Sequence, residues 1–128
     1  EGCVAELRRV WRTPRFLPPE PEPPIVIAAL GPKMAAVAGR LGDGINARAT
    51  DPRLADLIAV ARDAHRETGR DESQFLVTVF GLFDDIWLGP ESHELRQLET
   101  LGVHRVVLAL SAPFDRARIS AAGRHLAR

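Results

Sequence analysis

Hydrophobic positions along the chain follow two patterns that alternate from beginning to end. Short, nearly continuous apolar runs predict β-strands, and between them apolar residues recur every three or four positions, as in amphipathic helices. The predicted strands span residues 25–30, 45–47, 75–83 and 103–110. The predicted helices span residues 3–12, 32–41, 51–69, 93–101 and 115–127. This alternation indicates the α/β class, with about four parallel strands joined by right-handed crossovers.

The first predicted strand leads directly into a helix. Residues 25–30, IVIAAL, are continuously apolar, which predicts a strand buried on both faces. The run stops at Gly31-Pro32, and proline suits the first turn of a helix, where its missing amide costs nothing. Gly42 is a plausible end of that helix. Its apolar stripe is expected to comprise Met34, Val37, Ala38 and Leu41.

A second helix start is marked by Asp51-Pro52, a capping carboxylate followed by proline at the first helical position. We expect this helix to stop at Gly69. Its inward face is expected to comprise Leu54, Leu57, Ile58, Ala61 and Ala64 or His65. Upstream, residues 13–24 contain six prolines and predict an extended connector, because proline removes amide donors and fixes φ.

Composition narrows the classes of function. The chain has 128 residues, enough for one domain, and its 17 basic and 17 acidic residues leave no net charge to attract nucleic acid. No apolar run approaches the roughly 20 residues of a membrane span. Because Cys3 is the single cysteine, the chain has no intrachain disulfide, and we expect a cytoplasmic protein. A start at Glu1 rather than methionine suggests a processed or partial chain.

The turn after the first strand is the clearest candidate for chemistry. A buried strand, a tight glycine turn and a helix N-terminus bring free backbone amides and the positive end of a helix dipole together, which is the arrangement of an anion site. Small residues at Ala28 and Ala29 would let a ligand approach the backbone. The alternative is an ordinary strand-to-helix turn that binds nothing. The single glycine matches neither a Rossmann nor a Walker motif.

Other polar residues point less clearly to chemistry. The spacings of the four histidines match no metal-site pattern, so we expect no metal. Asp84 and Asp85 follow the third strand, at the end of the sheet where α/β sites form, although a solvated loop pair is the simpler interpretation. We expect Asp43 to orient the turn at Gly44, and Arg48 either to reach a ligand phosphate or to be solvated. The catalytic residues stay unassigned.

Residues 23–47, PPIVIAALGPKMAAVAGRLGDGINA, resemble the luciferase-like monooxygenase superfamily, in which a PPI strand, a G-P-[KR] turn and an A-x-x-A-D-G-like segment follow in this order. Residues 6–11, 65–75 and 101–110 fit the same family in register. Its members are (β/α)8 barrels that use reduced FMN or the deazaflavin coenzyme F420. AALGPKM is somewhat more similar to the deazaflavin-using branch.

The resemblance implies a partial TIM barrel. A complete (β/α)8 barrel takes about 250 residues, so residues 1–128 would form a single domain that corresponds to the C-terminal half of the barrel, with 13–24 as its connector. By the same resemblance, a flavin-type cofactor would be held near strand ends while an unknown small-molecule substrate is turned over. The implied cofactor-binding residues are Ala28, Ala29, Leu30, Gly31, Lys33, Asn46 and Ala47.

Three hypotheses for the whole chain follow. The first is a fragment of a flavin- or deazaflavin-dependent oxidoreductase or monooxygenase that contributes part of the cofactor phosphate site and is inactive alone. The second is a non-catalytic half-barrel that binds a second copy or a missing N-terminal half through its open sheet edges. A third, weaker option is an open flavodoxin-like sheet with a ligand of its own.

Overall fold

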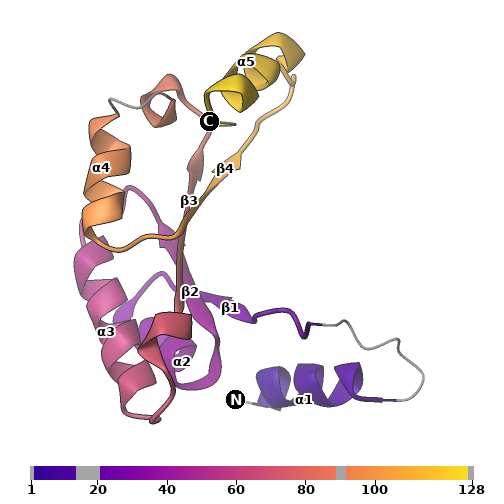
Figure 1. Ribbon diagram of the computed structural model, residues 1–128, viewed down its shortest axis with the longest axis vertical. Helices are drawn as coiled ribbons and strands as arrows, with labels where there is room; N and C mark the ends of the chain where they lie inside the picture. The colour runs from indigo at the N-terminus through magenta and orange to yellow at the C-terminus, as the bar shows by residue number, and fades with distance from the viewer. Residues whose placement is uncertain (1, 14–20, 89–91, 127–128) are drawn as a thin grey trace.

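The computed structural model describes residues 2–13, 21–88 and 92–126 (Figure 1). Five α-helices are present in this part of the chain: α1 Gly2–Trp11, α2 Pro32–Leu41, α3 Leu54–Arg66, α4 His93–Thr100 and α5 Arg116–Leu126. The strands are β1 Val26–Ala28, β2 Gly44–Arg48, β3 Leu76–Leu82 and β4 Arg105–Ala109. Two short 3₁₀ helices, η1 Glu72–Gln74 and η2 Asp85–Trp87, lie on either side of β3.

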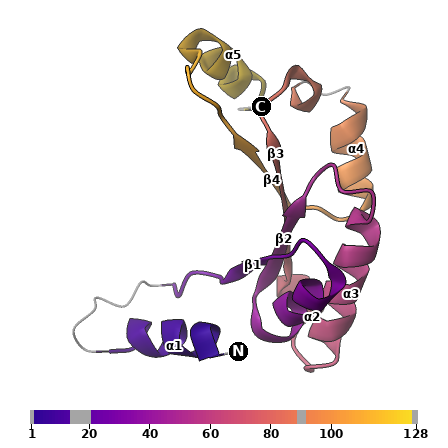
Figure 2. The same ribbon diagram turned by 180° about the vertical axis from the view of Figure 1, so that it is seen from behind.

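The four strands form one parallel sheet in the order β1-β2-β3-β4. In both views, α2, α3 and α4 lie on the same face of this sheet (Figures 1 and 2). A flavodoxin-like sheet reverses its strand order at a switch point and carries helices on both faces. Among the described strands the order does not reverse, so the flavodoxin-like option is wrong. Sequential strands covered by helices on one side confirm the α/β prediction and correspond to a partial TIM-barrel-like fold.

The hydrophobic core lies between the sheet and these helices. Strand residues point alternately to the two faces of a sheet, and the helix-covered face of β2 and β3 carries Ile45, Ala47, Val77 and Val79, all fully buried. The helices contribute Ala35, Ala38, Leu54, Leu57, Ile58, Ala61 and Leu98 to the same cluster. The core therefore lies on the helix-covered side of the sheet, which corresponds to the outer side of a barrel.

The opposite side of the sheet, here called the inner face, carries the alternate residues of each strand. Along it lie Ala28, Asn46, Arg48, Thr78, Phe80, Leu82, Arg105, Val107 and Ala109. Apolar side chains on this face are open to solvent: Leu82 is 71% exposed and Val107 is 46% exposed. In a closed barrel this face would line the interior, and the four strands seen here would form half of that lining.

Two details of the β1–α2 unit differ from the sequence-based expectations. The strand is three residues long and half-buried rather than buried on both faces, because β1 is an edge strand of the sheet. The buried stripe of α2 comprises Ala35, Ala38 and Gly39, whereas Met34 is 45% exposed. The stripe is shifted because α2 packs closely against α3 through small residues.

The start of α3 also differs. The Asp51 carboxylate accepts a hydrogen bond from the Arg53 amide at 2.8 Å, which closes a local turn before the helix. The helix itself begins at Leu54, so Asp51 does not cap it and Pro52 is not its first residue. The expected inward face of α3 is buried, and His65 is buried with it.

Most of the predicted proline-rich connector, residues 14–20, lies outside the described residues.

Candidate functional site

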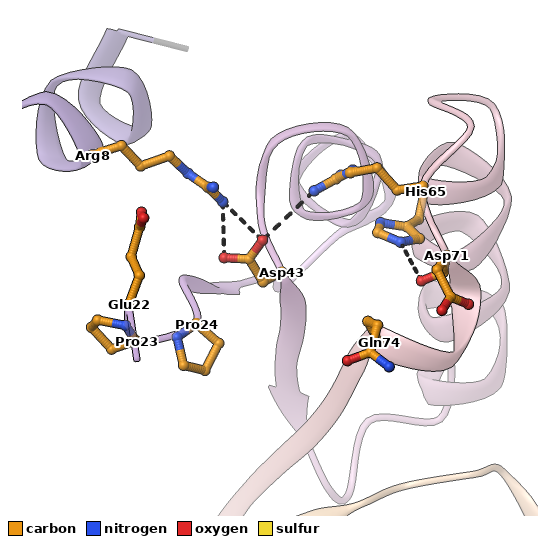
Figure 3. Close-up of a pocket in the computed structure, with 9 residues that line it drawn as sticks. Arg8, Glu22, Pro23, Pro24, Asp43, His65, Asp71 and Gln74 are labelled. Atoms are coloured by element: carbon orange, nitrogen blue, oxygen red, sulfur yellow. Dashed lines mark hydrogen bonds and ion pairs between the residues drawn. The ribbon is translucent and has the colours of Figure 1, made fainter. Parts of the chain in front are cut away.

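A charged cavity of about 380 Å³ lies at the amino ends of the strands (Figure 3). Its centre is Asp43, whose Oδ2 accepts a hydrogen bond from the Ile25 amide at 2.8 Å. Arg8 of α1 donates to both Asp43 carboxylate oxygens, at 2.8 and 2.9 Å. Asp43 thus joins α1 to the beginning of β1 and β2, which agrees with the structural role expected for it.

The remaining polar groups of this cavity also bind the chain itself. Arg70 donates to carbonyl groups at the end of α2 and just after it, with Arg40 O at 3.0 Å and Gly42 O at 2.8 Å. The buried His65 ring lies between two carbonyl oxygens, 3.3 Å from Gly39 O and 3.2 Å from Asp71 O. These groups close the amino end of the sheet, and ligands of parallel α/β sheets bind at the opposite, carboxyl end.

At the carboxyl end, the β1–α2 turn brings several of the predicted site residues together. Ala28 lies beside Asn46 in the strand register and is exposed. The Ala29 side chain is fully buried, and its amide donates to Asn46 O at 2.9 Å. The Ala29 amide therefore belongs to the sheet, and free amides have to come from residues after it.

The residues after Ala29 offer such amides. The first hydrogen bond of α2 runs from the Ala35 amide to Gly31 O at 3.0 Å, so the Lys33 and Met34 amides have no acceptor within the helix. Gly31 has an extended backbone, with φ −169°, and no atom lies within 4 Å of the place where a Cβ would be. Open space and free amides therefore meet at Gly31.

The other predicted residues are distributed differently. Asn46 is half-buried on the inner face, where the Thr78 hydroxyl lies 3.0 Å from Asn46 Oδ1 and 3.0 Å from Ile45 O. Ala47, in contrast, faces the core beneath the helices, so only its backbone reaches the site side. Lys33 is exposed in the first turn of α2. The turn and Asn46 are neighbours, whereas the Ala47 side chain is not part of that group.

Two adjoining cavities at this end were not predicted. The first, of about 350 Å³, is lined by Leu30, Arg48, Thr50, Asp51, Pro52 and Arg53. The second, of about 480 Å³, shares Arg48 and Thr50 with it and is otherwise mostly apolar. Arg48 lies two residues after Asn46 on the same strand. Because strand side chains alternate between the two faces, this spacing could have predicted that Arg48 lies on the inner face with Asn46.

The β2–α3 loop in the first cavity contains a carboxylate with an altered pKa. The Arg53 guanidinium and amide hydrogen-bond the Asp51 carboxylate and, with the charge of Arg48, lower the pKa of Asp51 below its ordinary value. Because the folded pKa is lowered, this carboxylate contributes stability above the ordinary Asp pKa and loses it as pH falls through the folded value.

Replacing Arg53 with glutamine is therefore expected to raise the pKa of Asp51 toward its ordinary value. An NMR titration of the Asp51 side chain measures this. Arg62→Gln is the matched control, because Arg62 lies on α3 and donates to Gly102 O at 3.2 Å instead. An Asp51 midpoint that Arg53→Gln leaves unchanged would contradict the assigned cause.

Other candidate residues are placed as follows. Asp85 forms an exposed ion pair with Arg118 of α5 at 2.9 Å, and Asp84 is exposed in the loop after β3. His104 accepts a hydrogen bond from the Val77 amide through Nδ1 at 3.0 Å, at the edge of the sheet. In the part of the chain that the structure describes, no three His, Cys, Asp or Glu side chains form a group able to hold a metal ion.

Comparison with known proteins agrees with this geometry. The family model described as luciferase-like monooxygenase matches residues 2–83, which include α1, the β1–α2 turn and β3. The chain belongs to this family. It is also 45% identical over 53 residues to the F420-dependent hydroxymycolic acid dehydrogenase of Mycobacterium tuberculosis (strain ATCC 25618 / H37Rv), a match that covers 41% of this chain and 15% of that protein. Among the described helices, none is long and apolar enough to span a bilayer.

Proposed function

We propose that the chain is part of a flavin- or deazaflavin-dependent oxidoreductase and that its β1–α2 turn holds the cofactor phosphate. The observation that carries this proposal is the turn itself. It combines free amides, the positive end of α2 and unoccupied space at Gly31, all at the carboxyl end of a parallel sheet. Ala28, Ala29, Leu30, Lys33, Asn46 and Ala47 surround or support this turn in the proposal.

Family membership and the open inner face support assigning residues 1–128 to the C-terminal half of a barrel. The relative that is named F420-dependent favours coenzyme F420 over FMN as the cofactor. The cofactor would supply hydride transfer or oxygen insertion, while this chain binds and orients its phosphate. The single cysteine, Cys3, supports a cytoplasmic location.

Gly31→Val tests the phosphate site. We expect this chain to bind F420 weakly and without turnover, and valine at position 31 to weaken binding by about tenfold or more, the equivalent of ~1.4 kcal/mol. The β-branched side chain fits the extended backbone without a clash in the protein, but it fills the space over the amides. Titration followed by F420 fluorescence measures the affinity, and circular dichroism checks the fold.

Gly123→Val in α5 is the matched control, because no atom lies within 4 Å of a Cβ there either. Equal F420 affinity of the Gly31→Val and Gly123→Val variants would show that the turn does not hold the phosphate. F420-dependent turnover by this chain alone would contradict the proposal that it supplies only part of the site.

The second candidate function is a half-barrel that assembles with a second copy or with a missing N-terminal half. The observation in its favour is that Leu82 and Val107 are exposed on the inner face, in a sheet whose outer strands, β1 and β4, each pair with one strand among the described residues. Size-exclusion chromatography with light scattering tests self-association. A stable monomer would argue against pairing with a second copy.

A further inference from the structure

We infer that Thr78 is a positioning residue for the proposed site: its hydroxyl holds the Asn46 carboxamide so that the amide nitrogen, Nδ2, faces the ligand and donates to a phosphate oxygen. This role rests on the proposed function and adds a residue to it. Thr78 is 5% exposed, although it lies on the inner face, where Leu82 of the same strand is 71% exposed. A buried hydroxyl needs hydrogen-bond partners, so the partners of Thr78 indicate what it does.

Thr78 lies in a row of inner-face residues that crosses the sheet at one level. In the strand register, Ala28 of β1 pairs with Asn46 of β2, and Asn46 pairs with Thr78 of β3. Ala28 is exposed and ends in a methyl group, and the β1–α2 turn follows it directly. Neighbouring strands lie about 4.8 Å apart, so the Asn46 side chain is within reach of both neighbours. Asn46 therefore has a hydroxyl on one side and the open start of the turn on the other.

The Thr78 hydroxyl contacts two oxygen atoms of β2. It lies 3.0 Å from Ile45 O and 3.0 Å from Asn46 Oδ1. The first contact ties the hydroxyl to the backbone of the strand, and the second places the carboxamide oxygen of Asn46 on the buried Thr78. A carboxamide carries its accepting oxygen and its donating nitrogen on one carbon, so fixing Oδ1 on Thr78 turns Nδ2 away from it.

The Nδ2 group of Asn46 is accessible. It donates no hydrogen bond within the part of the chain that the structure describes. Because no buried side-chain nitrogen or oxygen among the described residues lacks a partner, an unpaired Nδ2 has to reach the surface. An N–H donor is complementary to the oxygens of an anionic phosphate, whereas a carboxamide oxygen in its place would repel them. The orientation that Thr78 imposes therefore suits the phosphate of the proposed site.

Four single variants test this role through F420 binding followed by fluorescence. Thr78→Val removes the hydroxyl, keeps the branched shape and is expected to weaken binding by about threefold to tenfold, because the carboxamide is no longer held. Thr78→Ser keeps a hydroxyl and should bind nearly as tightly as the unmodified chain. Asn46→Asp puts a carboxylate oxygen in place of Nδ2, so it should weaken binding more than Asn46→Ala does.

A double variant separates positioning from a general role in the fold. In the Asn46→Ala background, Thr78→Val is expected to cause no further loss of F420 affinity, because the hydroxyl acts through a side chain that is already gone. In the chain without cofactor, Thr78→Val should also shift the NMR signals of the Asn46 side-chain amide. Thr100→Val is the matched control, since the Thr100 hydroxyl donates to Arg96 O within α4 at 2.9 Å.

Three outcomes would overturn the inference and leave the proposed function in place. The first is F420 binding that Thr78→Val leaves unchanged or weakens no more than Thr100→Val does. The second is an equal loss from Thr78→Val in the Asn46→Ala background. The third is binding by Asn46→Asp as tight as by Asn46→Ala, because the carboxamide would then present its oxygen. A chain that does not bind F420 would overturn the proposed function together with this role.

Discussion

Gly39→Ala is expected to lower the free energy of unfolding by about 3 kcal/mol or more, the upper end of the cost of overpacking a core. A Cβ at position 39 would overlap the Ala61 carbonyl oxygen of α3. It would also lie 2.8 Å from Ala64 Cβ and 2.9 Å from the His65 amide nitrogen. Because these are backbone and Cβ atoms, they move only if the two helices separate. Urea unfolding followed by circular dichroism measures the loss.

Gly123→Ala is the control for this prediction. The same exchange in α5 meets no atom within 4 Å, so alanine should stabilise that helix by up to ~1 kcal/mol through its higher helix propensity. Opposite signs for the two variants would locate the close helix contact at Gly39. An unfolding midpoint that Gly39→Ala leaves unchanged would show that α2 and α3 are further apart than the structure has them.

This same contact explains where the sequence-based prediction of α2 was wrong. Apolar spacing placed the helix correctly and led to a buried stripe that began at Met34. The structure buries Ala38 as predicted, but Ala35 and Gly39 are buried with it and Met34 is 45% exposed. A periodicity argument weights large apolar residues, whereas two helices approach most closely where their residues are small. That approach depends on α3, so the residues of α2 alone do not reveal it.

For the strands too, the local sequence predicted where they lie, but their lengths and burial depend on the sheet as a whole. The apolar run at residues 75–83 contains the whole of β3, because a central strand is mostly apolar on both faces. The run at residues 25–30 gives a strand of only three residues. One further hydrogen bond at each end of β1 extends its pairing by one residue: the Asp43 amide donates to Ile25 O, and the Ala29 amide donates to Asn46 O. Which strand lies at the edge is a property of the sheet, and composition does not specify it.

For the candidate site, the sequence predicted the turn but not the side of the sheet. Ala28 and Asn46 are neighbours, as expected. Asn46 and Ala47 were both expected at the rim of the site, but consecutive strand residues face opposite sides of a sheet, and the Ala47 side chain lies in the core. Arg48, which was expected either to reach a ligand phosphate or to be solvated, is exposed on the same face as Asn46 and lines both carboxyl-end cavities. The sequence did not show which face of the sheet the helices cover. That face is determined by the packing of the whole four-stranded sheet, and it decides which strand side chains point to the site.

Trp87→Ala is expected to lower the free energy of unfolding by about 3–5 kcal/mol, the usual cost of truncating a buried tryptophan. The Trp87 side chain is 4% exposed and belongs to the main core cluster. Its ring packs against Gly81, where a Cβ would lie 3.3 Å from Cζ2, and its Nε1 donates to Leu82 O. Because this ring supports the end of β3 and lines the larger carboxyl-end cavity, its removal also changes the shape of that cavity.

Two further variants separate the contributions to this loss. Trp87→Phe keeps an aromatic ring in the core but removes the Nε1 hydrogen bond, so a smaller loss of roughly 1–2 kcal/mol is expected. Trp11→Ala is the control, because α1 has no buried residues and its half-buried tryptophan should contribute less than about 1 kcal/mol. Chemical unfolding followed by far-ultraviolet circular dichroism ranks the three variants without relying on tryptophan emission. If Trp11→Ala costs as much as Trp87→Ala, the carboxyl end of β3 is not braced by Trp87, and the stability of the sheet depends on the docking of α1 through Arg8 and Asp43 instead.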